Sequence, residues 1–203
     1  MQVGQVGRVG MLALLVAAAG TQLMAMTADL VRHEGLVHDG FITDLSLIVG
    51  VTMLEDDWDE LGDDMVTQVG LAYESRDLIW PMMVHSTLSF GRASGDALTT
   101  NFATLTLGAA KPWMAAGMQL HAGGGLAVVR ADMTLETPTG DLHEPEWGVG
   151  FYLHGGARKT IGNWQFGGDV RYTFAPLDKN PIFNGDKVNA GGLGAYLNIG
   201  LRF

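Results

Sequence analysis

Apolar residues occupy every second position at the end of the chain. Between residues 193 and 203 the apolar or small set is Leu193, Ala195, Leu197, Ile199, Leu201 and Phe203, and the set between them is Gly194, Tyr196, Asn198, Gly200 and Arg202. Successive side chains of a β-strand point to opposite faces, so this alternation predicts a strand with one apolar face and one polar or glycine face.

Seven earlier stretches show the same period of two. They lie near residues 41–53, 65–75, 82–91, 104–108, 118–135, 147–158 and 164–174. The fifth is the least regular, because its apolar set changes parity near Val128-Val129. This change predicts a β-bulge that turns Met133 and Leu135 onto the apolar face. The whole pattern predicts about eight strands.

The connections between these strands alternate in length. The second, fourth and sixth strands are predicted to end in tight turns at Arg76-Asp77, Lys111-Pro112 and Ile161-Gly162-Asn163. The other connections are predicted to be longer polar loops over residues 54–64, 92–101, 136–146 and 175–189. Tight turns at one rim and long loops at the other are typical of transmembrane β-barrels.

Charge placement separates a membrane barrel from the alternative, a soluble barrel or sandwich. Only 17% of the residues are charged, and the apolar faces carry almost none of them. A water-exposed surface with so few charges would aggregate, whereas lipid outside and polar residues inside remove the conflict. We therefore predict an all-β fold: a closed antiparallel up-and-down transmembrane β-barrel over residues 41–203. Residues 29–40 would be a short periplasmic entry segment, preceded by an N-terminal signal helix.

Residues 1–28 have the features of a secretory signal peptide. Arg8 supplies the positive region, and residues 11–20 (MLALLVAAAG) supply an apolar run of suitable length. Cleavage is predicted after Ala25 or Ala28, although neither site has the preferred small residue three positions upstream. The alternative is an uncleaved membrane anchor.

Net charge and cysteine content exclude several classes of function. The formal net charge is −10, which argues against a nucleic-acid partner, because binding phosphates needs clustered Lys and Arg. The chain has no cysteine, which excludes a lipoprotein anchor, disulfides and thiolate metal sites.

Three segments carry a resemblance to a known group of proteins. They are the signal run, the motif NWQFGGDVRYTF at residues 163–174, and the ending at residues 191–203. With these segments the chain resembles the small outer-membrane β-barrel families typified by the membrane domain of OmpA and by OmpX, Opa and OmpW. The resemblance covers most of the chain after residue 40, and it specifies the architecture more than the individual family.

The resemblance implies a location and a set of partners. It places the chain in the Gram-negative outer membrane, in contact with lipid and lipopolysaccharide, after delivery by periplasmic chaperones and the barrel-assembly machinery. The terminal Phe203 would be part of the assembly signal. The expected role is structural or surface-interacting, through long extracellular loops and without a cofactor. The alternatives are an OmpW-like, porin-like narrow channel for small solutes and a lipid-modifying barrel enzyme.

Charged residues on the predicted inward faces are the first candidate site. They are Asp44, Glu74, Arg158, Asp169, Arg171 and Arg202. An eight-stranded barrel is just wide enough for side chains to fill, and buried charges need partners. We expect a paired network that plugs the lumen; the alternative is a gated polar path.

Histidines on the inward faces suggest two kinds of chemistry, both weakly. His85, His121 and His154 could hold a metal only if strand stagger made them level, and no metal-ligand spacing is present. His85 and Ser86 point to opposite faces, which leaves Thr87 or Ser89 as the nearest hydroxyls on the face of His85. We therefore expect neither a metal site nor catalytic residues.

Carboxylates are concentrated in the first predicted loop. It holds seven of the 22 acidic residues, namely Glu55, Asp56, Asp57, Asp59, Glu60, Asp63 and Asp64. Such density suits Ca²⁺ or Mg²⁺, but the residue order is not that of an EF-hand, and a solvated charge run that keeps the loop soluble is the favoured interpretation. Trp80, Trp113, Trp147 and Trp164 lie near predicted strand ends, as expected of an aromatic girdle at the membrane interfaces.

Overall fold

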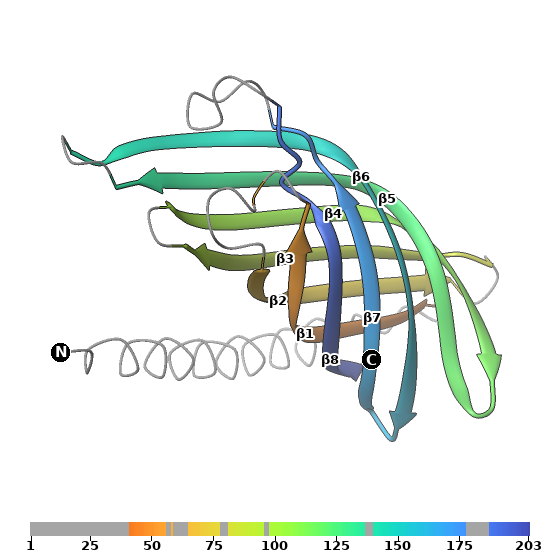
Figure 1. The fold of residues 1–203 in the computed structure, drawn as a ribbon. Helices are drawn as coiled ribbons and strands as arrows, with labels where there is room; N and C mark the ends of the chain where they lie inside the picture. Colours follow the sequence, from red (N-terminus) through yellow and green to blue (C-terminus); the bar gives the residue numbers. More distant parts are fainter. Residues whose placement is uncertain are drawn as a thin grey trace, which may run out of the picture. The chain divides into compact units, whose positions relative to one another are not determined.

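Eight antiparallel strands form a closed barrel in the computed structural model (Figure 1). The structure describes residues 41–55, 58, 65–77, 81–95, 98–136, 140–177 and 187–203. The strands are β1 (Phe41–Leu54), β2 (Met65–Asp77), β3 (Met83–Ser94), β4 (Leu98–Ala115), β5 (Met118–Leu135), β6 (Leu142–Ile161), β7 (Trp164–Phe174) and β8 (Gly192–Arg202). Each strand pairs with its neighbours in sequence, and β1 pairs with β8 from Asp44–Arg202 to Leu54–Gly192. The predicted closed up-and-down barrel is confirmed.

Two predicted segments lie outside the described residues: the signal peptide at 1–28 and the entry segment at 29–40. Within the described part of the chain, no α-helix is long and apolar enough to cross a membrane.

The outward face carries large apolar side chains on every strand. Leu197 at the middle of β8 is 74% exposed, and Leu126, Val149, Leu153 and Val170 are also exposed. Burial alternates with exposure along β8, from Gly192 to Gly200. Closure of the sheet satisfies the backbone groups, so this apolar surface is compatible with contact with lipid.

Strand β5 departs from the sequence prediction. It pairs with β4 and β6 without a break in register from Gln119 to Leu135, so the predicted bulge near Val128-Val129 is wrong. Val129, Ala131 and Met133 are buried on the inward face, like Gln119 and His121 before them. The change in the sequence pattern therefore marks a lumen that becomes apolar, rather than a change of face.

Several connections differ from the prediction as well. β4 continues to Ala115 and turns at Ala116-Gly117, beyond the predicted Lys111-Pro112, and both turn residues have positive φ (51° and 74°). The β3–β4 and β5–β6 connections are shorter than predicted, at residues 95–97 and 136–141. The strands continue beyond the part of the barrel whose outer face is apolar. Outward side chains there need not be apolar, so the alternation of apolar and polar residues fades before the strands end.

We use two names for the ends of the barrel. The turn end contains the start of β1, the turns at 116–117 and 162–163, and the end of β8. The loop end contains the connections β1–β2 and β7–β8, which at residues 55–64 and 175–191 are the longest between neighbouring strands.

Candidate functional site

An ion pair closes the turn end of the lumen. Arg202 donates from Nε to Asp44 Oδ1 at 2.8 Å and from Nη2 to Oδ2 at 3.0 Å. Gln165 also donates to Asp44 Oδ2, at 2.8 Å, and Arg202 reaches Gln119 Oε1 at 3.4 Å. The Arg202 side chain is partly exposed, whereas that of Asp44 is buried. β1 and β8, which close the barrel, are thus also joined by a side-chain pair.

A second, fully buried ion pair lies in the lumen. Both terminal nitrogens of Arg158 donate to the two carboxylate oxygens of Glu74, and each residue is only 3% exposed. His85 lies beside this pair, with Nε2 3.6 Å from Glu74 Oε1 and Nδ1 3.1 Å from the Tyr152 hydroxyl. The pair joins β2 to β6, which are not neighbours in the sheet, so it crosses the lumen.

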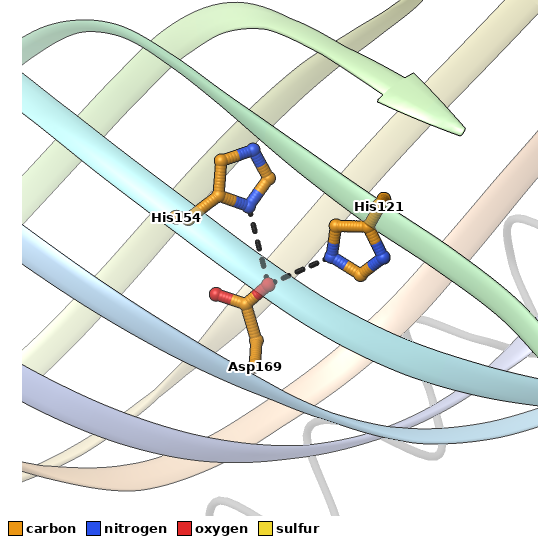
Figure 2. A group of neighbouring side chains, drawn as sticks. All are labelled: His121, His154 and Asp169. Carbon is orange, nitrogen blue, oxygen red and sulfur yellow. Dashed lines mark hydrogen bonds and ion pairs between the residues drawn. The ribbon is translucent and has the colours of Figure 1, made fainter. Parts of the chain in front are cut away.

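Two histidines converge on one carboxylate oxygen (Figure 2). His121 Nε2 lies 2.8 Å and His154 Nδ1 lies 3.1 Å from Asp169 Oδ2. The three residues come from the adjacent strands β5, β6 and β7, and all are buried. The imidazole of His85 stacks on that of His154 at 4.4 Å between ring centres.

Gly156 makes room for this convergence. It is the register partner of His121 on β5 and of Asp169 on β7, and it lies two residues from His154 on the same face. A Cβ atom at Gly156 would lie 2.7 Å from His121 Cε1 and 2.9 Å from His121 Nε2. The His121 ring therefore lies over the bare backbone of β6 and reaches Asp169 on the far side.

Arg171 lies between Asp169, which the two histidines contact, and the lumen residues Thr87, Tyr152 and Tyr196. Its guanidinium donates to Thr87 Oγ1 at 2.8 Å and lies 3.9 Å from Asp169 Oδ1. It also lies over the rings of Tyr152 and Tyr196, at 5.5 and 5.1 Å from their centres. These contacts neutralise and hold a buried cation on several sides. The space beside it measures about 10 Å³, room for about one water molecule.

An apolar cluster fills the loop end of the lumen. Its buried members are Leu54, Trp58, Val66, Ala93, Leu98, Phe102, Val129, Ala131, Met133, Ala175, Leu177, Val188 and Ala190. Trp58, from the β1–β2 connection, is 1% exposed, packs edge-on against Phe102 and donates to the Asn189 backbone oxygen at 2.7 Å. Residues from both long connections therefore close the barrel together with inward strand residues.

The structure places each predicted lumen residue on the inward face. Arg158 pairs with Glu74, Arg202 pairs with Asp44, and Arg171 lies beside Asp169. The sequence prediction missed Tyr152 and Tyr196 as partners of Arg171, although Tyr196 was on the predicted polar face of its strand. It also missed the pairing of His121 and His154 with Asp169, because no spacing along the chain reports the stagger of three strands.

Other predicted site residues occupy the rims. Trp113 and Trp164 are exposed near the turn end, and Trp147 is exposed in the loop-end half of β6. Trp80 and six of the seven acidic loop residues lie outside the described part of the chain; the seventh, Glu55, accepts a hydrogen bond from the Tyr172 hydroxyl at 2.7 Å. The backbone of Phe203 pairs with Thr43 of β1, through N–O distances of 2.9 and 3.3 Å.

The hydroxyls nearest to His85 on its own strand are bonded elsewhere. Thr87 Oγ1 lies 2.6 Å from Thr106 Oγ1 and also accepts from Arg171. Ser89 donates to Gln68 at 3.2 Å. A histidine–hydroxyl pair of the kind that activates a nucleophile is therefore not formed by these residues.

Comparison with known proteins identifies the fold. No protein-family model matches the chain, and no curated protein sequence matches it. The barrel is similar to Ail, the attachment invasion locus protein of Yersinia pestis, solved with the heparin analogue sucrose octasulfate (TM-score 0.52, 14% identity, 82% of this chain and 100% of that one). It is equally similar to a major outer membrane protein of Thermus thermophilus (TM-score 0.52, 13% identity, 82% and 100%). The chain thus has the fold of the small outer-membrane β-barrels.

Proposed function

We propose that this chain is an outer-membrane protein with a closed lumen and a structural or surface-interacting role. The observation that carries the proposal is that two kinds of side chain, polar and apolar, fill the lumen. Paired charges and histidines occupy the turn end and the middle, and the apolar cluster occupies the loop end. An eight-stranded barrel of this kind has room for side chains rather than for a water column.

The long connections are the part of the molecule that we expect to meet external partners. Residues 55–64 carry seven acidic residues, so a polyanion such as the sulfated ligand of Ail would be repelled here. A cationic surface fits this negative charge better. So does an anionic surface, such as the phosphates of lipopolysaccharide, when divalent cations bridge it to the loop. We propose that the loop end interacts with partners of this chemistry without a catalytic step.

Location gives the first test. The mature chain is expected to fractionate with outer-membrane markers and to migrate in a heat-modifiable form on gels, because the outward apolar face needs lipid. Deletion of Phe203 is expected to reduce the inserted fraction, since its backbone pairs with Thr43 of β1 at the closing seam. Recovery of the intact chain in the soluble periplasm would refute the proposal, and unaffected insertion of the deletion variant would refute the role given to Phe203.

Conductance gives the second test. Refolded monomer in a planar bilayer is expected to show little steady current, because the Arg158–Glu74 layer and the apolar cluster both obstruct the lumen. A Trp58→Ala variant removes one closing side chain at the loop end and is expected to stay closed, because the ion-pair layer remains. A stable, large ohmic pore from the wild-type monomer would contradict the closed-lumen proposal.

A narrow path for small apolar solutes is the second candidate function. One observation favours it: the loop-end half of the lumen is lined by apolar residues such as Val66, Phe102 and Met133. Trp58 and Leu177 pack into that lining, so transport would require the two long connections to move away. This candidate would take first place if the wild-type monomer conducts.

A further inference from the structure

We propose that His121, His154 and Asp169 bind one divalent transition-metal ion of the Zn²⁺ class inside the lumen. The inference is independent of the proposed function, because neither the location nor the conductance of the barrel requires it. It rests on three buried donor groups that three neighbouring strands bring to one point (Figure 2).

The donor spacing fits a single coordination sphere. Asp169 Oδ2 lies 2.8 Å from His121 Nε2 and 3.1 Å from His154 Nδ1, and the three donor atoms all lie within 4.8 Å of one another. Metal–ligand bonds of about 2.0–2.2 Å place adjacent ligands about 2.8–3.6 Å apart in octahedral or tetrahedral sites. Both N–O distances therefore lie within the range of a coordination edge, whereas the two ring nitrogens are held only within 4.8 Å of each other, so binding an ion can require them to draw closer.

The donor types restrict the class of ion. Two imidazoles and one carboxylate suit Zn²⁺, Fe²⁺, Co²⁺ and similar ions, whereas Ca²⁺ and Mg²⁺ prefer a shell made of oxygens. Three protein ligands leave at least one position for water or another group. Arg171 lies 3.9 Å from Asp169 Oδ1, so it approaches the other oxygen and leaves Oδ2 to face the two rings.

The surroundings hold the donors in place. Gly156 admits the His121 ring, which a Cβ atom at that position would meet at 2.7 Å. His85 stacks on His154 and is itself fixed by Tyr152 and Glu74. These contacts hold the ring of His154 in place and leave space for that of His121.

The competing interpretation is a network of hydrogen bonds alone, in which each ring donates one N–H to Asp169. His121 Nδ1 and His154 Nε2 are then buried acceptors, whereas metal binding would make them buried N–H donors; in both cases they have no hydrogen-bond partner among the described residues. The two interpretations predict different behaviour in the presence of metal, which makes them separable by experiment.

The test uses the full chain. The chain is unfolded in denaturant that contains a chelator, the chelator is removed, and the chain is refolded in detergent with either Co²⁺ or Zn²⁺. Excess ion is removed by gel filtration, bound metal is measured by mass spectrometry, and Co²⁺ is also followed by its visible absorption. We expect about one ion per folded chain. Refolding in chelator is expected to give a folded, heat-modifiable barrel without metal and with a lower melting temperature.

The variants His121→Gln and His154→Asn, combined in one chain, separate the two interpretations. Each amide can still donate an N–H towards Asp169, but it replaces an imidazole ligand. We expect the bound ion to be lost. The decrease in metal affinity should exceed the roughly 10- to 100-fold decrease that follows removal of a residue that only hydrogen-bonds to a metal ligand. His143→Gln is the matched control, because His143 is exposed on β6 and contacts Thr134 rather than the site.

A glycine pair gives an independent test of the geometry. Gly156→Ala is expected to weaken metal binding, because a Cβ atom there would lie 2.4 Å from the Gly168 backbone oxygen and 2.7 Å from His121 Cε1, so both the adjoining β7 backbone and the His121 ring must shift. Gly155→Ala should not weaken it, because the nearest atom to a Cβ there is a backbone oxygen at 3.5 Å. If Gly156→Ala does not fold, the histidine variants decide the question. Retention of one ion by the double histidine variant, or a wild-type chain that refolds with no retained ion, would overturn the proposal and leave Asp169 as a hydrogen-bond acceptor only.

Discussion

The substitution Glu74→Gln is expected to lower the free energy of unfolding by about 3–5 kcal/mol, because it leaves a buried guanidinium without its counter-ion. Arg158 is 3% exposed and donates to both oxygens of Glu74. Gln has nearly the volume of Glu, so the change creates no cavity, and the measured loss reports the charge. The measurement is equilibrium unfolding by urea in lipid vesicles, followed by tryptophan fluorescence.

Asp132→Asn is the matched control for this substitution. Arg130 and Asp132 also form an ion pair, at 2.9 Å, but their side chains are 45% and 29% exposed. Exposed pairs contribute about 0–1 kcal/mol, so this variant should unfold close to wild type. Equal stability losses in the two variants would show that the buried pair has no special role in the lumen.

The strand alternation allowed the barrel to be predicted from sequence because lipid and lumen impose opposite demands on successive residues. β7 and β8 show why this worked: Phe166, Val170, Leu197 and Ile199 are exposed, whereas Asp169 and Arg171 are buried. A strand needs only its own sequence to display this period, so tertiary contacts were not required for the prediction.

The prediction failed where the lumen itself becomes apolar. Val129, Ala131 and Met133 face inward and pack with Trp58 and Leu177 from the two long connections. Apolar character alone assigns such a residue to lipid, and only the contacts made by the connections show that it can also face a dry lumen. The error over the β5 bulge therefore comes from a lumen that is apolar at its loop end.

The histidine–carboxylate cluster was unpredictable for a different reason. His121, His154 and Asp169 meet because their strands are staggered so that Gly156 is the register partner of both His121 and Asp169. The stagger is a property of the closed sheet as a whole. The sequence identified the inward face of each residue, but it held no information about height along the barrel axis.

Height along the axis also determines the effect of a charge on the outer face. Leu197→Arg is expected to lower the free energy of unfolding from the bilayer by about 2–4 kcal/mol, because it places a cation on the lipid face near the middle of the membrane. Leu197 is 74% exposed and lies at the centre of β8, paired with Val49 on β1 and Gly168 on β7. The measurement is the same vesicle unfolding experiment, at low and high salt.

Ile161→Arg is the control for depth. Ile161 is also a large, exposed apolar residue, but it ends β6 beside the turn at Gly162-Asn163. An arginine there can reach water and lipid headgroups, so a loss of only about 0–1 kcal/mol is expected. If both variants lost the same stability, the outward face would have no depth profile, and contact of this face with a bilayer would be refuted. If neither variant lost any stability, the apolar face would have to be covered by protein rather than by lipid.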